Sequence, residues 1–173
     1  MRFAEVSGPL LIEDIALDPR AIQILACGNT LRGDDGVGSR IAALLEASPP
    51  SEGMRVTFTA QLLPEHAELV SAADQVIFFD CSALTPAGTI SVLPVEPAAN
   101  SPTSFTHYLD PAMLLRLAQD LYGRTPAGAT LITIGGESFE MNEELSSSVT
   151  AAIPEALDAV RLVCTAREHE KHQ

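Results

Sequence analysis

Five short apolar runs alternate with helical patterns along the chain, and this alternation constrains the fold more than any other feature. The runs cover residues 23–27, 55–60, 75–80, 89–95 and 129–134. Several are almost continuously apolar, as strands buried on both faces are. Strands that alternate with helices predict an α/β fold with a mostly parallel sheet, whose ligands bind at the carboxyl ends of the strands. Residues 89–95 precede a proline-containing stretch without helical pattern, which is typical of an antiparallel edge strand and a long loop.

Three helical segments stand out between and after the strands. The first has an apolar stripe made of Val37, Ile41, Leu44 and Leu45. The second has Asp110 at its N-cap, Pro111 in its first turn and Gly123 after its end. Its expected buried face consists of Leu114, Leu117, Ala118 and Leu121. The last covers about residues 143–167, where Pro154 either kinks the helix or starts a new one.

Length and composition predict one acidic domain over residues 1–173. Residues 1–20 precede the first strand as an N-terminal extension, and the polar residues 168–173 are expected to form a flexible tail. A formal net charge of −13 disfavours nucleic acid and membrane surfaces as partners. The first residues lack the pattern of a signal peptide. The three cysteines, Cys27, Cys81 and Cys164, are odd in number and outside any CxxC pair, which argues against a disulfide framework and structural zinc. We therefore expect a cytoplasmic protein.

The glycine-rich stretch "LACGNTLRGDDGVGSRI", residues 25–41, joins the first strand to the first helix. Gly33, Gly36 and Gly38 give GxxGxG, the reverse of the dinucleotide fingerprint, and no GK[ST] follows. Asp34 and Asp35 also lie where a bound phosphate needs donors without negative charge. Nucleotide binding is therefore disfavoured.

Two explanations remain open for the paired aspartates. In the first, Asp34 caps the helix and Asp35 favours its positive end, together a contribution of roughly 0.3–2 kcal/mol. In the second, the loop holds a cation, because two adjacent carboxylates raise each other's proton affinity unless a cation or donor neutralises them.

Two further residues join Asp35 in a candidate metal site. Asp80 ends the apolar strand in "QVIFFDCS", where a turn or cap residue is also common. The carboxyl ends of parallel strands share one edge, so we expect Asp35 and Asp80 to converge there. His107 lies in a loop entering a helix and completes an oxygen, oxygen, nitrogen set that suits nickel, zinc, iron or manganese. Weaker candidates are His66, His169 and His172.

A competing chemistry uses Cys81 as a nucleophile, His107 as its base and either Asp80 or Asp35 to orient the histidine. Nothing in the local sequence activates the thiol. Neighbouring carboxylates raise the pKa of a cysteine, so this alternative is disfavoured.

The chain resembles the hydrogenase maturation endopeptidases, which trim the C-terminus of the large subunit of [NiFe] hydrogenases. "GNTLRGDDGVG" is similar to their GNxLxxDDGxG signature, and "VIFFDCS", "THYLDPAMLLRLA" and "FEMNEELS" match later blocks in the same order. The resemblance implies a three-layer α/β/α sandwich with a twisted, mostly parallel five-stranded sheet. It also implies that Asp35, Asp80 and His107 are the catalytic, nickel-contacting residues.

From this resemblance we expect an endopeptidase, acting as a monomer, that removes a C-terminal extension from the nickel-loaded large-subunit precursor. The nickel is then supplied by the precursor. A nickel- or precursor-binding chaperone without proteolytic activity is the alternative. Asn142 departs from the family pattern, which has glycine in this block; asparagine tolerates a left-handed backbone, so the turn is expected to survive.

Overall fold

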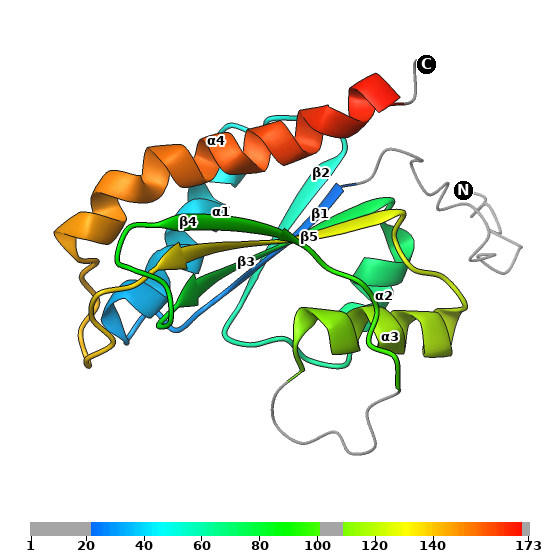
Figure 1. The fold of residues 1–173 in the computed structure, drawn as a ribbon, viewed down its shortest axis with the longest axis horizontal. Coiled ribbons are helices and arrows are strands. Elements are labelled where there is room, and N and C mark those ends of the chain that lie inside the picture. Colours follow the sequence, from blue (N-terminus) through cyan, green and yellow to red (C-terminus); the bar gives the residue numbers. More distant parts are fainter. Residues whose placement is uncertain (1–21, 101–108, 171–173) are drawn as a thin grey trace, which may run out of the picture.

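The sheet contains the five predicted strands, and Figure 1 shows it between two layers of helices. The computed structural model describes residues 22–100 and 109–170. The strands are β1 (Ile22–Cys27), β2 (Met54–Thr59), β3 (Gln75–Ser82), β4 (Ile90–Pro94) and β5 (Gly128–Gly135). Their order is β2-β1-β3-β5-β4. Only β4 is antiparallel, at the edge beside β5, as its sequence predicted.

The four α-helices of the described residues follow β1, β2, β4 and β5, and no helix separates β3 from β4. They are α1 (Val37–Ala47), α2 (His66–Ala72), α3 (Pro111–Tyr122) and α4 (Ser147–Glu170), and a short 3₁₀ helix, η2 (Gly33–Gly36), precedes α1. Figure 1 shows α1 and α4 on one face of the sheet and α2 and α3 on the other. The predicted α/β/α sandwich is therefore confirmed.

Two apolar cores lie on the two faces of the sheet, because successive strand side chains point to opposite sides. Ile77 and Phe79 of β3 pack with residues of α1 and α4. Val76 and Phe78 of the same strand pack with residues of α2 and α3. All six residues of β1 are buried, which explains its continuous apolar sequence.

Helix α3 has the predicted ends but not the whole predicted buried face. The Asp110 carboxylate accepts a 2.7 Å hydrogen bond from the backbone N–H of Met113, and Gly123 has a φ of 68°. Leu114, Leu117 and Ala118 are buried, and so is Leu115, which was not predicted. The prediction for Leu121 was wrong, because this side chain, in the last turn of the helix, is 62% exposed.

The last helix begins later than predicted and continues through its proline. Residues 143–146 precede α4, which runs as one element past Pro154 to Glu170. The N-terminal extension, residues 1–20, and the last three residues of the expected tail lie outside the described residues. No helix within the described ranges is both long and apolar enough to cross a membrane.

Candidate active site

The carboxyl ends of β1 and β3 lie side by side and bring the acidic loop and Asp80 to one edge. Ala26 pairs with Phe79 in parallel register, so the next residues, Cys27 and Asp80, are neighbours at this edge. The chain leaves β1 here and turns through η2 into α1. The site is thus built where an α/β sheet binds ligands.

Two glycines let the acidic loop pack directly against the end of β1. Gly28 has a φ of 141°, and a Cβ there would lie 1.8 Å from the backbone oxygen of Asp35. A Cβ at Gly38 would lie 2.0 Å from the backbone oxygen of Cys27. Side chains at these positions are incompatible with the observed approach of helix and strand. The glycines therefore serve close packing rather than phosphate binding.

Asp34 is buried and is the structural member of the acidic pair. Its Oδ2 accepts hydrogen bonds from the backbone N–H groups of Glu137 at 2.7 Å and Ser138 at 2.9 Å, and its Oδ1 accepts one from Ser146 at 2.6 Å. Burial favours the protonated acid, but these N–H groups and the Ser146 hydroxyl outweigh burial and lower the pKa of Asp34. The carboxylate therefore fastens the β5–α4 loop, residues 136–146, to the acidic loop.

The interpretation of Asp34 as a helix cap was wrong. The N-cap positions of η2 and α1 are Arg32 and Gly36, and neither helix start has a side-chain capping bond. The local pattern suggested a cap because aspartate near a helix start usually bonds the next turn. Its actual partners are more than 100 residues away in the chain, where a single sequence gives no contact information.

Asp35 is half-buried, and one of its two carboxylate oxygens can still contact a ligand. Its Oδ2 accepts a 2.9 Å hydrogen bond from the backbone N–H of Asn29, which orients the carboxylate. Within the described part of the chain, its other oxygen has no hydrogen-bond donor. Asp34 and Asp35 therefore have separate surroundings although they are adjacent in sequence.

Asp80 is half-buried in the same region. Burial raises its pKa to about 6; the backbone N–H of Cys81, 2.8 Å from Oδ1, opposes the shift and the charge of Asp35 adds to it. Cys27 is affected by the same two carboxylates, since burial and then the charges of Asp80 and Asp35 raise the pKa of its thiol to about 12. The structure thus brings Asp35 and Asp80 close enough to interact. Their role as metal ligands stays a prediction.

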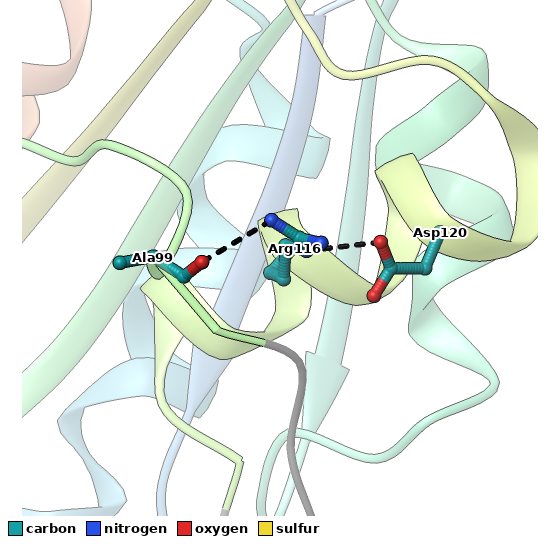
Figure 2. Close-up of polar contacts among 3 residues, drawn as sticks. All are labelled: Ala99, Arg116 and Asp120. Carbon is teal, nitrogen blue, oxygen red and sulfur yellow. Dashed lines mark hydrogen bonds and ion pairs between the residues drawn. The ribbon is translucent and has the colours of Figure 1, made fainter.

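His107 lies outside the described residues, but the structure describes both flanks of its segment. Before it, the backbone N–H of Ala98 donates to Ala112 at 2.9 Å. Figure 2 shows Arg116 of α3 between the backbone oxygen of Ala99, 3.4 Å away, and Asp120, 2.9 Å away. After it, Asp110 caps α3. Both flanks are thus attached to the first half of α3.

Asp80 lies on the face of the sheet that α2 and α3 cover. Val76 and Phe78 face α2 and α3, and Asp80, two residues further along β3, belongs to the same face. Within residues 22–100 and 109–170, no three His, Cys, Asp or Glu side chains form a group that could hold a metal.

The environment of Cys81 opposes the cysteine-nucleophile alternative. Burial and the charges of the nearby aspartates raise the pKa of this thiol to about 12, with only the backbone N–H of Ser82 acting in the other direction. The reactive thiolate is therefore scarce at neutral pH.

The weaker metal-ligand candidate His66 has a structural explanation. Its Nδ1 accepts a 3.0 Å hydrogen bond from the backbone N–H of Leu63, and its side chain is buried.

Reasoning from local sequence missed the contribution of the β5–α4 loop. The backbone N–H of Gly33 donates to Asn142 at 2.7 Å, and Arg32 and Asn142 form an isolated parallel bridge. The expectation of a left-handed turn at Asn142 was wrong, since no described non-glycine residue has a positive φ. Its Oδ1 instead accepts a 2.7 Å bond from the backbone N–H of Glu144. The available signal was the family-like "FEMNEELS" block, which carried no information about contacts.

A groove between α1 and α4 lies away from the carboxylates. It has a volume of about 570 Å³ and is lined by residues that include Leu44, Leu145 and Ile153. Neither Asp35 nor Asp80 borders it. Its lining contains no pair of carboxylates comparable to Asp35 and Asp80.

The fold and the acidic sheet edge define an α/β protein of the endopeptidase class, to which the similar solved structures belong. The hydrogenase maturating endopeptidase HybD from E. coli is 27% identical, with a TM-score of 0.64 over 86% of this chain and 93% of that one. A hydrogenase 2 maturation peptidase from a Thaumarchaeota archaeon is 26% identical, with a TM-score of 0.60 over 81% and 95%. The predicted resemblance to hydrogenase maturation endopeptidases is confirmed, and the chain is an endopeptidase.

A more distant structure has the same fold. The [NiFe] hydrogenase maturation protease HycI from Thermococcus kodakarensis is 20% identical and has a TM-score of 0.63, over 84% of this chain and 93% of that one. No family model and no curated protein sequence matches this chain.

Proposed function

We propose that this endopeptidase removes a C-terminal extension from the nickel-loaded large-subunit precursor of a [NiFe] hydrogenase, and that it acts as a cytoplasmic monomer. The observation that carries the proposal is the meeting of Asp35 and Asp80 at the carboxyl edge of the sheet, where burial and, to a smaller extent, the charge of Asp35 raise the pKa of Asp80. This edge belongs to a fold shared with a hydrogenase maturating endopeptidase that is 27% identical.

In this proposal the nickel belongs to the substrate, and the enzyme supplies ligands that approach it. Asp35 offers the oxygen that no described donor occupies, Asp80 offers a second carboxylate, and His107 offers an imidazole nitrogen. Oxygen and imidazole ligands suit a borderline divalent ion. Because these three residues fill only part of a coordination sphere, they can recognise nickel that is still bound to the precursor. The metal arrives with the substrate and does not have to be removed from it.

Peptide hydrolysis requires that water adds to the scissile carbonyl, that the C–N bond breaks and that the leaving amine gains a proton. A nickel ion beside this bond would supply Lewis acidity, which would favour attack on the carbonyl or ionisation of the water. One of the two carboxylates can take the proton from water and return it to the leaving amine. The N–H of Asn29 orients Asp35 throughout.

Mass spectrometry of the precursor tests the proposal. Purified enzyme is incubated with nickel-loaded precursor and, in parallel, with nickel-free precursor. We expect a short C-terminal peptide to be lost only from the loaded form, and Asp35→Asn to prevent the loss. An unchanged mass, with nickel content and folding verified, contradicts the proposal. Stable association without cleavage instead identifies a precursor-binding chaperone.

A further inference from the structure

Three large apolar side chains are exposed on three different loops at the edge that carries the carboxylates. Leu84 is 98% exposed, Met141 is 84% exposed and Leu31 is 52% exposed. Leu31 lies four residues before Asp35, and Leu84 lies four residues after Asp80. Exposed apolar side chains that collect around a polar site indicate an interaction surface more strongly than scattered ones do.

Backbone contacts join the three loops that carry these side chains. Arg32, the neighbour of Leu31, forms a parallel bridge with Asn142, the neighbour of Met141. On the other side, Ser82 accepts a 2.9 Å bond from the backbone N–H of Gly136, where the β5–α4 loop begins, and its hydroxyl accepts a 3.2 Å bond from the N–H of Leu84. The three side chains therefore belong to one edge of the molecule; we call them the apolar rim.

Charges on the β5–α4 loop indicate what kind of partner fits this rim. Glu140, Glu143 and Glu144 are exposed next to Met141, and none of them forms an ion pair with a described residue. With a formal net charge of −13, a second copy of the chain would place like charges against this loop. A partner that brings a metal cation and cationic side chains is complementary instead.

We propose that Leu31, Leu84 and Met141 form a docking rim for the nickel-loaded large-subunit precursor, contacting an apolar segment beside the bond that is cleaved. The inference rests on the proposed function and extends it by naming the residues that bind the substrate outside the metal-contacting set. Methionine suits such a surface because its unbranched side chain adapts to the shape of a partner. The Asp34 carboxylate holds Met141 in place indirectly, by fastening the loop that carries it.

Glutamine substitutions test the rim without changing side-chain size greatly. The variants are Leu84→Gln, Met141→Gln and the double variant. Leu162→Gln is the matched control, because Leu162 is 69% exposed on α4, roughly 20 Å along the helix from its first residue at 1.5 Å per residue. Two quantities are measured for each protein: kcat and KM for cleavage of nickel-loaded precursor, and Kd for the precursor by biolayer interferometry.

We expect each rim variant to raise KM and Kd about tenfold, with kcat within about twofold of the wild type, since lost apolar burial weakens binding without altering the reacting groups. The control is expected to match the wild type. If the double variant has the KM and Kd of the wild type, the proposal that these side chains form a docking rim is wrong. If the wild type binds the precursor but does not cleave it, the proposed function fails. The Kd values of the variants then decide by themselves whether the rim binds the precursor. If the wild type neither binds nor cleaves, both proposals fail.

Discussion

The carboxylate of Asp34 accepts a 2.6 Å hydrogen bond from the backbone N–H of Ser146, which lies 112 residues later in the chain. This bond joins the loop after β1 to the loop before α4, the two loops that carry Asp35 and Met141. The neighbouring carboxylate of Asp35 instead faces the open edge of the sheet with a single described donor, the N–H of Asn29. One acid of the pair thus serves structure, and the other is available for chemistry.

Parallel Asp34→Asn and Asp35→Asn variants separate these roles. We expect Asp34→Asn to lower the free energy of unfolding by about 2–3 kcal/mol, because an amide is a poorer acceptor for three buried N–H groups than a carboxylate. For Asp35→Asn we expect a change below about 1 kcal/mol, with loss of precursor cleavage. Urea denaturation of both proteins gives the comparison. Equal stabilities would contradict the division of roles.

Asp80→Asn is expected to stabilise the metal-free protein at neutral pH. The folded protein has a pKa of about 6 at Asp80, above the ordinary value of 3.8. The unfolded chain therefore ionises first, and stability falls as pH rises from about 4 to 6. Removing the acid should gain about 1–2 kcal/mol above pH 7, after allowance for partial exposure.

Denaturation of wild type and Asp80→Asn at pH 4, 5, 6 and 7, with chelator present, measures this difference. The gap between the two proteins should widen with rising pH and close near pH 4. A gap that stays constant across this range would show that the substitution acts through packing rather than through charge.

Cys81→Ala is expected to retain precursor cleavage within about threefold of the wild type. A thiol whose pKa is raised to about 12 is almost entirely protonated at pH 7.5 and cannot act as the nucleophile without a base close by. Initial cleavage rates of Cys81→Ala and Asp35→Asn, measured side by side, distinguish the mechanisms. Lost activity in a folded Cys81→Ala protein together with activity in Asp35→Asn would favour the cysteine hydrolase.

Gly38→Ala tests the close approach of α1 to β1. The added Cβ would lie 2.0 Å from the backbone oxygen of Cys27, so helix and strand must move apart, and we expect a loss of about 3 kcal/mol or more. Gly123→Ala is the control: its φ of 68° strains alanine, but nothing lies within 4 Å of the new Cβ, so about 1 kcal/mol is expected. Thermal denaturation compares the two. A similar Tm for both would show that backbone conformation, not the steric contact, sets the cost.

The strands and the ends of α3 could be predicted because their determinants are local. β3 is recognisable from its own apolar run, and α3 from Asp110, Pro111 and Gly123 within one short segment. The apolar stripe of α3 was predictable as well, but the exposure of Leu121 was not, since burial of the last turn depends on whether another element extends over it.

The sequence by itself determined the order of strands and helices and the side chains available for chemistry: two carboxylates after parallel strands, and a histidine before α3. Only the tertiary structure decided that Asp34 fastens a distant loop, that Asp35 and Asp80 share one electrostatic environment, and that the loops carrying three exposed apolar side chains meet at the same edge. Hydrophobic periodicity and helix capping depend on residues only a few positions apart, so both can be recognised in a single sequence. Contacts across 100 residues depend on how the layers pack, and a single sequence does not record which loops then meet.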